Sequence, residues 1–298
     1  MTNDAQSQHA SGYQVIPCPE HRRREALLHL AAVHDTTQQA DLQHALTTAR
    51  SADWRGLWVA MTGEHILAAA WVQPLSSQTA QLWLPRHVDA ALPLLNALRE
   101  WIRREPIALC HVVLPAPWDA WERTLVHGGM RAMATLEHRV WTCRTSVAPQ
   151  PSLGLRPFTM FPLAEQHALL ARVGEASLDC PALRDALPVT TLLAGFQAQA
   201  GSSQPSHWFG LTYQQREVGV LLLGTSSSHW SLQLMGLVPE WRGQGLGRAI
   251  IGHAHTLAAE AGAQSLSLTV DAQNTPARRV YDHTGFELRG RERLLGWY

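Results

Sequence analysis

The feature that most constrains the fold is a segment that occurs twice. Residues 123–130 align with residues 279–286 without a gap, at a constant offset of 156 positions (281 minus 125). Each half of the chain also shows the same order of predicted elements: a helix-rich start, a strand hairpin, and then strand, helix, strand, helix, strand. A duplicated domain explains both observations, because a repeated unit repeats its elements at a fixed spacing. Chance similarity between two mixed segments is the alternative.

The midpoint of the chain has the composition of a linker. Residues 145–152 are polar and include two prolines, which favour an irregular connection over a helix or strand. A length of 298 residues suits two domains of about 150 residues each. We therefore predict one domain at residues 1–148 and a second at residues 153–298.

The second half has a clear pattern of alternating and helical spacing. Residues 208–212 and 218–224 are predicted to form a hairpin, and residues 230–238 a third strand. Apolar residues at helical spacing begin at Leu246, and Gly262 is placed to end that helix. A further strand follows at 265–270. Asn274 is then the predicted N-cap of a helix in which Pro276 takes the first position.

The composition excludes several classes of function. Charged residues make up 16% of the chain and hydrophobic residues 46%, which is typical of a globular protein, and the formal net charge is zero. We therefore expect no nucleic-acid partner. No apolar run approaches the roughly 18 residues of a membrane span, and the first residues lack signal-peptide features, so we expect no membrane partner and a cytoplasmic location. The cysteines and histidines lack metal-site spacing, and no metal is predicted.

The strongest local signal is a glycine-rich segment between a strand and a helix. Gly243, Gly245 and Gly247 are spaced by two, so that backbone can approach a ligand without obstruction by side chains. The first N–H groups of the following helix are unpaired, and the helix dipole adds partial positive charge there. Arg242 and Arg248 are placed to reinforce a site for a pyrophosphate. The spacing fits neither a dinucleotide-binding motif nor a P-loop.

These residues resemble the signatures of the GNAT superfamily of N-acetyltransferases. Arg242, Gly245 and Gly247 match its glycine motif, and Asn274 followed by Tyr281 and a Gly-Phe pair looks like its second signature. The resemblance covers about the last 145 residues, and the first half fits as a degenerate copy. It implies an α/β (α+β) fold of two tandem GNAT-like domains, each a mixed, mostly antiparallel sheet flanked by helices. It also implies acetyl-CoA as the co-substrate.

The resemblance also implies roles for particular residues. Backbone N–H groups of residues 243–248 hold the pyrophosphate, and the strand ending at residues 236–238 separates from its neighbour to bind the pantetheine arm and place an N–H near the thioester carbonyl. Tyr281 is the general acid that protonates the leaving thiolate. Asn274 either contacts the cofactor or only caps its helix. The predicted cofactor-binding residues are Leu237, Val238, Arg242, Gly243, Gln244, Gly245, Leu246, Gly247, Arg248 and Asn274.

The resemblance leaves the general base open. Gln233 stands in the strand where family members often carry a carboxylate, and an amide cannot act as a base. The remaining candidates are a chain of water molecules or one of five carboxylates, Glu175, Asp179, Asp185, Glu240 and Asp271.

The expected activity is acetyl transfer from acetyl-CoA to a primary amine by direct attack on the thioester. The acceptor is a small-molecule amine or a peptide. The alternatives are a protein that senses acyl-CoA without turnover, and an enzyme that uses another acyl group or a hydroxyl acceptor.

The first half lacks the residues that carry this chemistry. Residues 88–93 stand where the second half has its glycine segment, and they contain no glycine. At the offset of 156, Trp118 replaces Asn274 and Leu125 replaces Tyr281. We expect a structural role for this half, as an internal substitute for the second subunit of a dimer. The chain is then a monomer or a weak homodimer.

Overall fold

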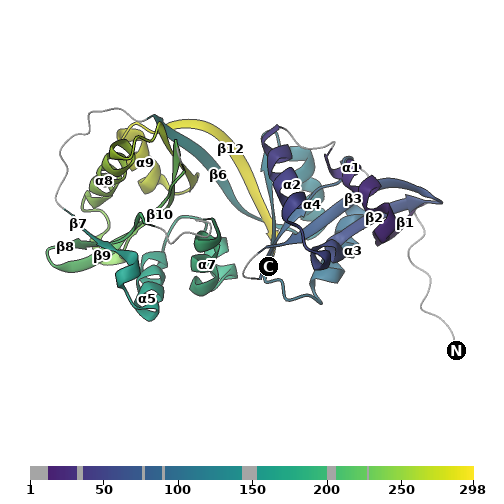
Figure 1. Cartoon of the computed structure of the whole chain (residues 1–298), viewed down its shortest axis with the longest axis horizontal. Coiled ribbons are helices and arrows are strands. Elements are labelled where there is room, and N and C mark those ends of the chain that lie inside the picture. The colour runs from purple at the N-terminus through teal and green to yellow at the C-terminus, as the bar shows by residue number, and fades with distance from the viewer. Residues whose placement is uncertain are drawn as a thin grey trace. The chain divides into compact units, whose positions relative to one another are not determined.

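Figure 1 shows the computed structural model of the chain, which describes residues 13–31, 36–75, 78–88, 91–142, 153–199, 206–226 and 228–298. By their contacts the residues form two compact units. Unit 1 comprises Met1–Val112, Asp119–Arg131 and Leu295–Tyr298, and unit 2 comprises Val113–Trp118 and Ala132–Leu294. The predicted linker at residues 145–152 lies outside the described residues.

The described strands of unit 1 lie in the order β1-β2-β3-β4-β5. Neighbours are antiparallel except for β4 and β5, which are parallel. Unit 1 also contains the short helices η1 (Glu20–Arg22) and η2 (Ser51–Gly56). Its strands and longer helices are β1 (Gln14–Pro17), α1 (Arg23–Ala31), α2 (Thr36–Thr48), β2 (Leu57–Thr62), β3 (His65–Pro74), β4 (Thr79–Trp83), α3 (Ala91–Ile102), β5 (Leu109–Pro115) and α4 (Asp119–His127).

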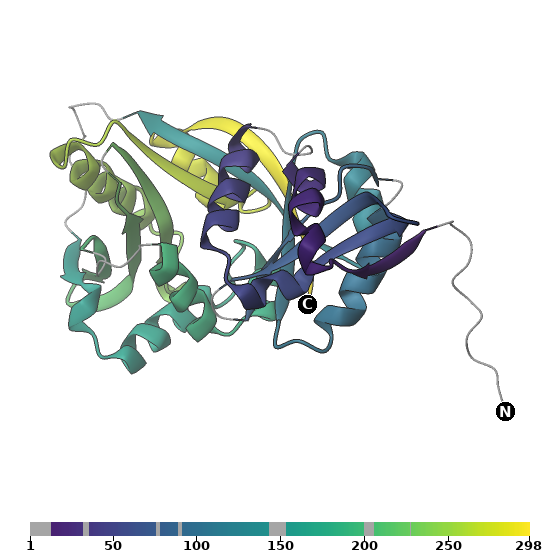
Figure 2. The same ribbon diagram turned by 45° about the vertical axis from the view of Figure 1, so that its right-hand side comes forward.

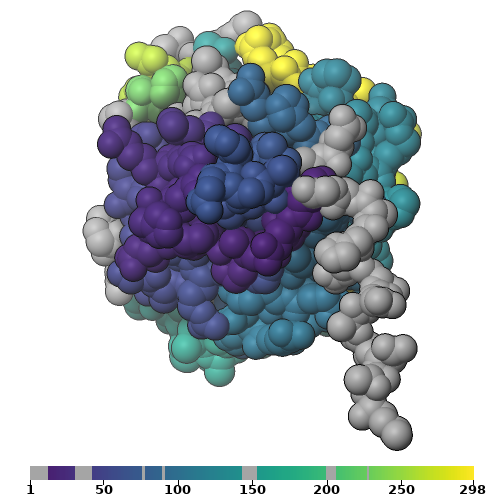
Figure 3. Space-filling model, turned by 90° about the vertical axis from the view of Figure 1, so that its right-hand side faces the viewer, coloured from purple at the N-terminus to yellow at the C-terminus, as the bar shows by residue number. Residues whose placement is uncertain are grey.

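The core of unit 1 forms because its strands present apolar side chains to helices. Leu30 of α1 packs with Leu57, Trp71 and Trp83 of the strands in one buried cluster. The indole of Trp71 stacks on Trp54 with ring centroids 5.0 Å apart, and its N–H donates to the Asp53 carbonyl. The space-filling view shows the surface that the first elements of this unit form, in purple and dark blue (Figure 3).

The described strands of unit 2 lie in the order β7-β8-β9-β10-β11-β6-β12. The pair β10 and β11 is parallel, and β6 is antiparallel to β11. The short helices are η4 (Phe158–Met160) and η5 (Pro239–Trp241). The other elements are β6 (Arg131–Thr142), β7 (Gly154–Pro157), α5 (Leu163–Gly174), α6 (Pro181–Ala186), α7 (Val189–Gln199), β8 (Trp208–Tyr213), β9 (Arg216–Gly224), β10 (His229–Leu237), α8 (Leu246–Glu260), β11 (Ser265–Asp271), α9 (Thr275–His283) and β12 (Glu287–Trp297).

Unit 2 has three layers because β9 is apolar on both faces. Leu221 and Leu223 pack in the cluster that includes α8 and α9, whereas Val220 and Leu222 pack in the cluster that includes α5 and α7. Successive side chains of a strand point to opposite faces, so this alternation places helices on both sides. Figures 1 and 2 show α8 and α9 on one side of these strands and α5 and α7 on the other. The strand predicted at residues 218–224 is therefore a central one.

The predicted duplication is confirmed in the positions of the elements. Adding 156 to the bounds of β5 and α4 gives the bounds of β11 and α9, and β6 and β12 begin 156 residues apart (287 minus 131). Gly129 and Gly285, at equivalent positions, have φ of 84° and 85°. The predicted fold class, two tandem α/β domains with mixed, mostly antiparallel sheets, is also confirmed.

The two copies share their last strands in a way that the repeat does not predict. β6 comes from the first half of the sequence but packs in unit 2. The last residues of β12, by contrast, belong to unit 1, where the Trp297 indole donates to the Gly128 carbonyl at 3.1 Å. The division into a structural domain that ends at residue 148 and a catalytic domain that begins at residue 153 stays a prediction. By contacts, the second unit already includes Ala132 to Thr142.

Small differences from the predicted elements have local causes. The hairpin strands extend to Tyr213 and Arg216, because Gln214 and Gln215 alone make the turn, with φ of 50° and 62°. Pro276 takes the second position of α9, since the helix begins at Thr275. Gly262 follows the end of α8 with φ of 75°, as predicted.

None of the helices that the structure describes is long and apolar enough to cross a membrane. Within the described ranges, no three His, Cys, Asp or Glu side chains come together in a way that could hold a metal ion.

We expect a buried histidine to make unit 2 sensitive to acid. His255 of α8 stacks on Trp141 of β6 with ring centroids 3.7 Å apart, and its Nε2 has no hydrogen-bond partner among the residues that the structure describes. Burial lowers the pKa of His255 from 6.5 to about 4. The unfolded chain therefore binds a proton below pH 6.5 that the folded chain resists down to about pH 4. The contribution of His255 to the free energy of unfolding is fully present above pH 6.5 and is lost as the pH falls from 6.5 to about 4.

We expect His255→Phe to flatten this dependence. Between pH 7 and pH 4.5 the free energy of unfolding of the wild type should fall by about 2 kcal/mol more than that of the variant. Urea unfolding at both pH values measures the difference, and a constant offset between the proteins cancels. Equal losses in the two proteins would show that His255 does not carry the acid sensitivity.

Candidate functional site

The glycine-rich segment connects η5 to α8 in a conformation that requires glycine. Gly243 and Gly245 have φ of 74° and 81°, values that residues with a side chain rarely adopt. A Cβ added to either residue would have no heavy atom within 4 Å. Close packing of the protein therefore does not explain these glycines. They shape an exposed loop that a ligand can approach.

The start of α8 presents free backbone donors. Gly245 is the N-cap of this helix, and no side chain caps it. Within the part of the chain that the structure describes, the N–H groups of residues 243–247 donate to no protein acceptor, whereas Arg248 N–H donates to the Gly245 carbonyl at 3.2 Å. Unpaired donors and the helix dipole together favour an anion at this point. The geometry fits a pyrophosphate.

The arginines beside the loop differ in position. Arg242 is half-buried, and its guanidinium donates from Nε to the Leu237 carbonyl at 3.0 Å and from Nη2 to the Val173 carbonyl at 2.9 Å. It therefore ties the end of α5 to the end of β10. Arg248 is exposed in the first turn of α8. The Gln244 amide donates to the Glu240 carbonyl at 2.8 Å. Direct phosphate contacts by these side chains stay predictions.

The neighbouring strands β10 and β11 separate toward this loop. They pair from His229 with Ser265 to Leu232 with Leu268, and the pairing ends there although β10 runs on to Leu237. A bulge lies between Leu232 and Leu234, and the end of β10 pairs with β9 alone. Among the described strands, one edge of the segment 233–237 is thus left without a neighbour. The predicted separation at residues 236–238 is observed.

Three predicted cofactor residues can offer only backbone to a ligand. Val238 and Leu246 bury their side chains in the core. A Cβ on Gly247 would lie 3.3 Å from Val280 Cγ2, so this glycine lets α8 and α9 pack closely. Backbone donors near the start of α8, rather than these side chains, form the site.

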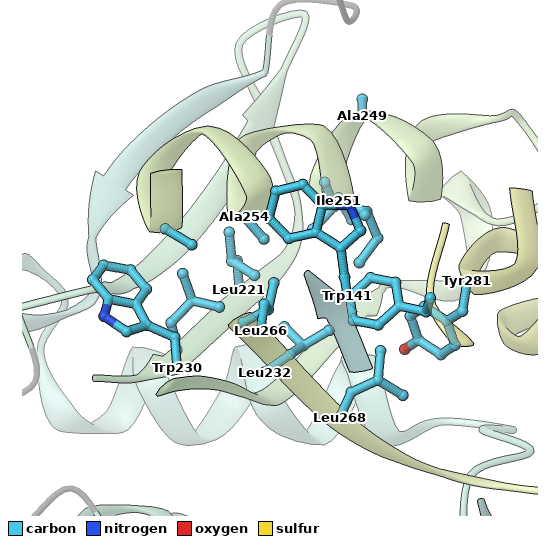
Figure 4. Packing of buried hydrophobic residues seen from close by; sticks show 14 of the residues in the cluster. Trp141, Leu221, Trp230, Leu232, Ala249, Ile251, Ala254, Leu266, Leu268 and Tyr281 are labelled. Atoms are coloured by element: carbon cyan, nitrogen blue, oxygen red, sulfur yellow. The ribbon is translucent and has the colours of Figure 1, made fainter. Parts of the chain in front are cut away.

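Asn274 and Tyr281 lie on α9, at its start and two turns later. The Asn274 side chain accepts a hydrogen bond from Ala277 N–H at 3.3 Å, which is the predicted capping role. Tyr281 is buried, with its ring 5.6 Å from that of Phe286. Figure 4 shows it at one end of the apolar cluster, with Trp141 beside it. Burial, together with the charge of Asp179, raises the pKa of the Tyr281 hydroxyl, which therefore stays protonated at neutral pH.

A buried carboxylate from the first half of the sequence supports α9. Glu137 of β6 is fully buried and accepts hydrogen bonds from Arg139 Nη2 at 2.8 Å, Arg278 Nε at 2.9 Å and Arg291 Nη2 at 2.8 Å. Burial opposes its ionisation, but the bonds from Arg139, Arg291 and Arg278 hold the pKa of Glu137 below its ordinary value. Arg139 also pairs with Asp282 of α9. The helix that carries Tyr281 is therefore bound to β6 by ion pairs.

Sequence reasoning missed this cluster, although one signal for it exists. Glu137, Arg139 and Trp141 alternate along β6, and all three are buried. Charged residues at alternate positions of a strand usually mark its solvent face. Their pairing depends on Arg278 and Arg291, which are distant in sequence.

The five candidate bases differ in their exposure to solvent and in the groups that they contact. Glu240 is exposed and paired with Arg172, and a hydrogen bond from its own backbone and the Arg172 charge lower its pKa. Asp185 is exposed and paired with Arg184 at 3.2 Å. Glu175 is exposed at the end of α5. Asp271 is buried and accepts from Gln273 N–H at 2.9 Å.

Asp179 is the one of these five carboxylates whose charge acts on Tyr281. Its Oδ1 accepts a hydrogen bond from Asp271 N–H at 2.8 Å, and the nearby Asn274 side chain acts to lower its pKa. Burial of the carboxylate by the surrounding protein and the nearby Asp271 raise its pKa, while part of the residue stays exposed. Asp179 therefore lies at the end of β11, near the start of α9, and its charge acts on Tyr281.

Comparisons with known proteins give a consistent result. The sequence profile described as "Acetyltransferase (GNAT) family" matches residues 176–286. The peptidyl-lysine N-acetyltransferase YjaB of Salmonella typhimurium strain LT2 is 34% identical over 87 residues. That match spans 29% of this chain and 54% of the Salmonella protein, so the chain covers about half the length of this curated relative.

Solved structures resemble the whole chain at low sequence identity. A GCN5-related N-acetyltransferase from Sphaerobacter thermophilus aligns with a TM-score of 0.63 and 17% identity, over 96% of this chain and 95% of that one. A tandem GNAT protein from the clavulanic acid biosynthesis pathway, solved without AcCoA, aligns with a TM-score of 0.51 and 15% identity, over 96% and 98%. At this identity the likeness concerns the fold alone.

Proposed function

We propose that this chain is an acetyltransferase of the GNAT family, whose model matches residues 176–286, and that it transfers the acetyl group of acetyl-CoA to a primary amine. The observation that carries the proposal is the free row of N–H donors at residues 243–247, beside the point where β10 and β11 separate. An anion site next to an unpaired strand edge suits a ligand that has a pyrophosphate and an amide-containing arm.

Different residues of unit 2 would carry out different parts of this reaction. Backbone donors of the glycine segment would hold the pyrophosphate, and the free edge at the end of β10, including Leu237, would bond to the pantetheine arm. Acetyl-CoA supplies an activated thioester carbonyl. A backbone N–H on that edge would stabilise negative charge on the carbonyl oxygen. Tyr281, protonated at neutral pH, would give its proton to the departing sulfur.

The acceptor is proposed as a primary amine in a small molecule or at a lysine side chain. The Salmonella relative is named for peptidyl-lysine, which supports the second possibility for this chain. The formal net charge of zero favours neither a strongly acidic nor a strongly basic partner.

Binding of acetyl-CoA to Gly245→Asp tests the cofactor site. A carboxylate at the N-cap of α8 repels phosphate, so we expect the Kd measured by isothermal titration to rise roughly 100-fold or more above that of the wild type, about 2.7 kcal/mol. Gly262→Asp is the matched control. That residue has a φ of 75° and open space like Gly245, but it lies at the opposite end of α8.

The control should bind acetyl-CoA within about threefold of the wild type, although it carries a similar backbone strain and an unfavourable charge at the helix C-terminus. Equal loss of binding in both variants would assign the effect to stability and not to the loop. Absence of acetyl-CoA binding by the wild type would overturn the proposed function.

A further inference from the structure

Asp179 lies in a loop whose conformation is held from several sides. The loop joins α5 to α6, and Ala176 and Cys180 have φ of 48° and 42°. Arg184 donates to the carbonyls of Gly174 and Ser177, both at 3.1 Å. Non-glycine residues with positive φ are costly and persist where the surrounding structure fixes them. The position of Asp179 is thus set by the fold.

The Asp179 carboxylate is both anchored and accessible. One oxygen, Oδ1, accepts from Asp271 N–H at 2.8 Å, and the residue remains partly exposed next to Leu178, which is 50% exposed. Asp271 itself is 2% exposed and bonded within its own turn. Of the two neighbouring carboxylates, Asp179 is therefore the one that a substrate can reach.

Charged and titratable groups around Asp179 come from four elements. Asp271 of β11 lies close to it with negative charge, and Tyr281 of α9 has a hydroxyl whose pKa is raised by burial and, in addition, by the charge of Asp179. Cys180, at the start of α6, is a thiol whose pKa is raised by burial and by both carboxylates. Arg139 of β6 acts on Tyr281 in the opposite sense. A carboxylate with a raised pKa whose charge acts on a protonated phenol can serve as a base paired with an acid.

We infer that Asp179 is the general base of the acetyl transfer and takes the proton of the acceptor ammonium, with Tyr281 as its acid partner. This inference rests on the proposed function. Asp179 takes one proton from the ammonium, and the nitrogen lone pair forms the C–N bond to the acetyl carbon. The electron pair of the C–S bond leaves on sulfur, which takes the Tyr281 proton. The second nitrogen proton returns to the Tyr281 oxygen, and Asp179 releases its own proton to water.

The test compares Asp179→Asn with Asp185→Asn at matched protein concentration. The amide oxygen can still accept from Asp271 N–H, so the first variant keeps the anchor and loses only the base. Asp185 is an exposed residue of α6 paired with Arg184, and it serves as the control. The assay measures CoA release and amide formation from acetyl-CoA with a panel of primary amines and lysine peptides, from pH 6 to pH 10. Acetyl-CoA affinity is measured in parallel.

We expect Asp179→Asn to lower kcat/KM for the amine about 10²- to 10⁴-fold at pH 7. The deficit should shrink as pH rises and bulk solvent deprotonates the amine, while acetyl-CoA affinity stays within about threefold. Asp185→Asn should retain activity within about twofold. An active wild type with an equally active Asp179→Asn, or with an unchanged pH profile in that variant, would overturn this inference alone. A wild type that acetylates no amine would overturn the proposed function as well.

Discussion

A chain that begins at residue 153 should fail to fold, because it lacks β6. This strand pairs with β11 along seven residue pairs from Ser265 to Asp271. Trp141 of β6 is 7% exposed and belongs to the same core cluster as Tyr281. Loss of a buried tryptophan costs about 3–5 kcal/mol. Loss of Glu137 removes the carboxylate that orders Arg278 and Arg291 on the remaining chain.

These losses are comparable with the whole stability of a domain, about 5–15 kcal/mol. We therefore expect the fragment 153–298 to show no cooperative thermal transition by circular dichroism and no binding of acetyl-CoA. The matched control keeps every residue of β6 but divides the protein into two separate chains. Residues 1–142 and 153–298, expressed together as two chains, should copurify and bind acetyl-CoA within a few-fold of the intact protein. Cooperative unfolding and full acetyl-CoA affinity in the fragment alone would contradict this view of β6.

Tyr281→Phe should lower kcat about 10²- to 10⁴-fold, which is the usual range for a general acid. The change removes one oxygen and keeps the ring that packs against Phe286. Since the pKa of Tyr281 lies above its usual range, the hydroxyl carries its proton throughout the neutral range and acts as a donor. The free energy of unfolding and the Kd for acetyl-CoA should both change little.

Tyr213→Phe provides the control for this experiment. That ring packs edge-on against Trp241 with centroids 5.6 Å apart, in the hairpin of β8 and β9. Its loss of a hydroxyl should leave kcat within about twofold. If Tyr281→Phe turns over as fast as Tyr213→Phe, the proton reaches the leaving sulfur from another source, and Tyr281 is a packing residue.

Local signals predicted the loop and the elements that carry it. Gly245 lies at the start of α8 and Gly262 just after its end, as the sequence indicates, because a left-handed backbone conformation at a helix end favours glycine. Asn274 caps α9 for a similar reason, since its side chain satisfies a free N–H. The first-half segment predicted to replace the glycine loop is described only in part, because residues 89 and 90 lie outside the described ranges.

Strand partners could not be predicted in the same way. The two halves repeat the same pattern, so periodicity alone does not say which copy of the last strand lies beside β11. Asp179 was one of five candidate bases named from the sequence, and its anchor, Asp271 N–H, is 92 residues away. Such contacts depend on the closure of long loops and leave no local pattern. The monomeric or weakly dimeric state suggested by the duplication stays a prediction.

The most direct measurement is mass spectrometry of an amine panel after incubation with the intact protein and acetyl-CoA labelled in the acetyl group. We expect the label to move to the nitrogen of at least one primary amine, with one CoA released for each amide formed. Acetyl-CoA binding without any transfer would instead support a sensing protein. Release of CoA with labelled acetate and no amide would contradict the assignment of an amine acceptor.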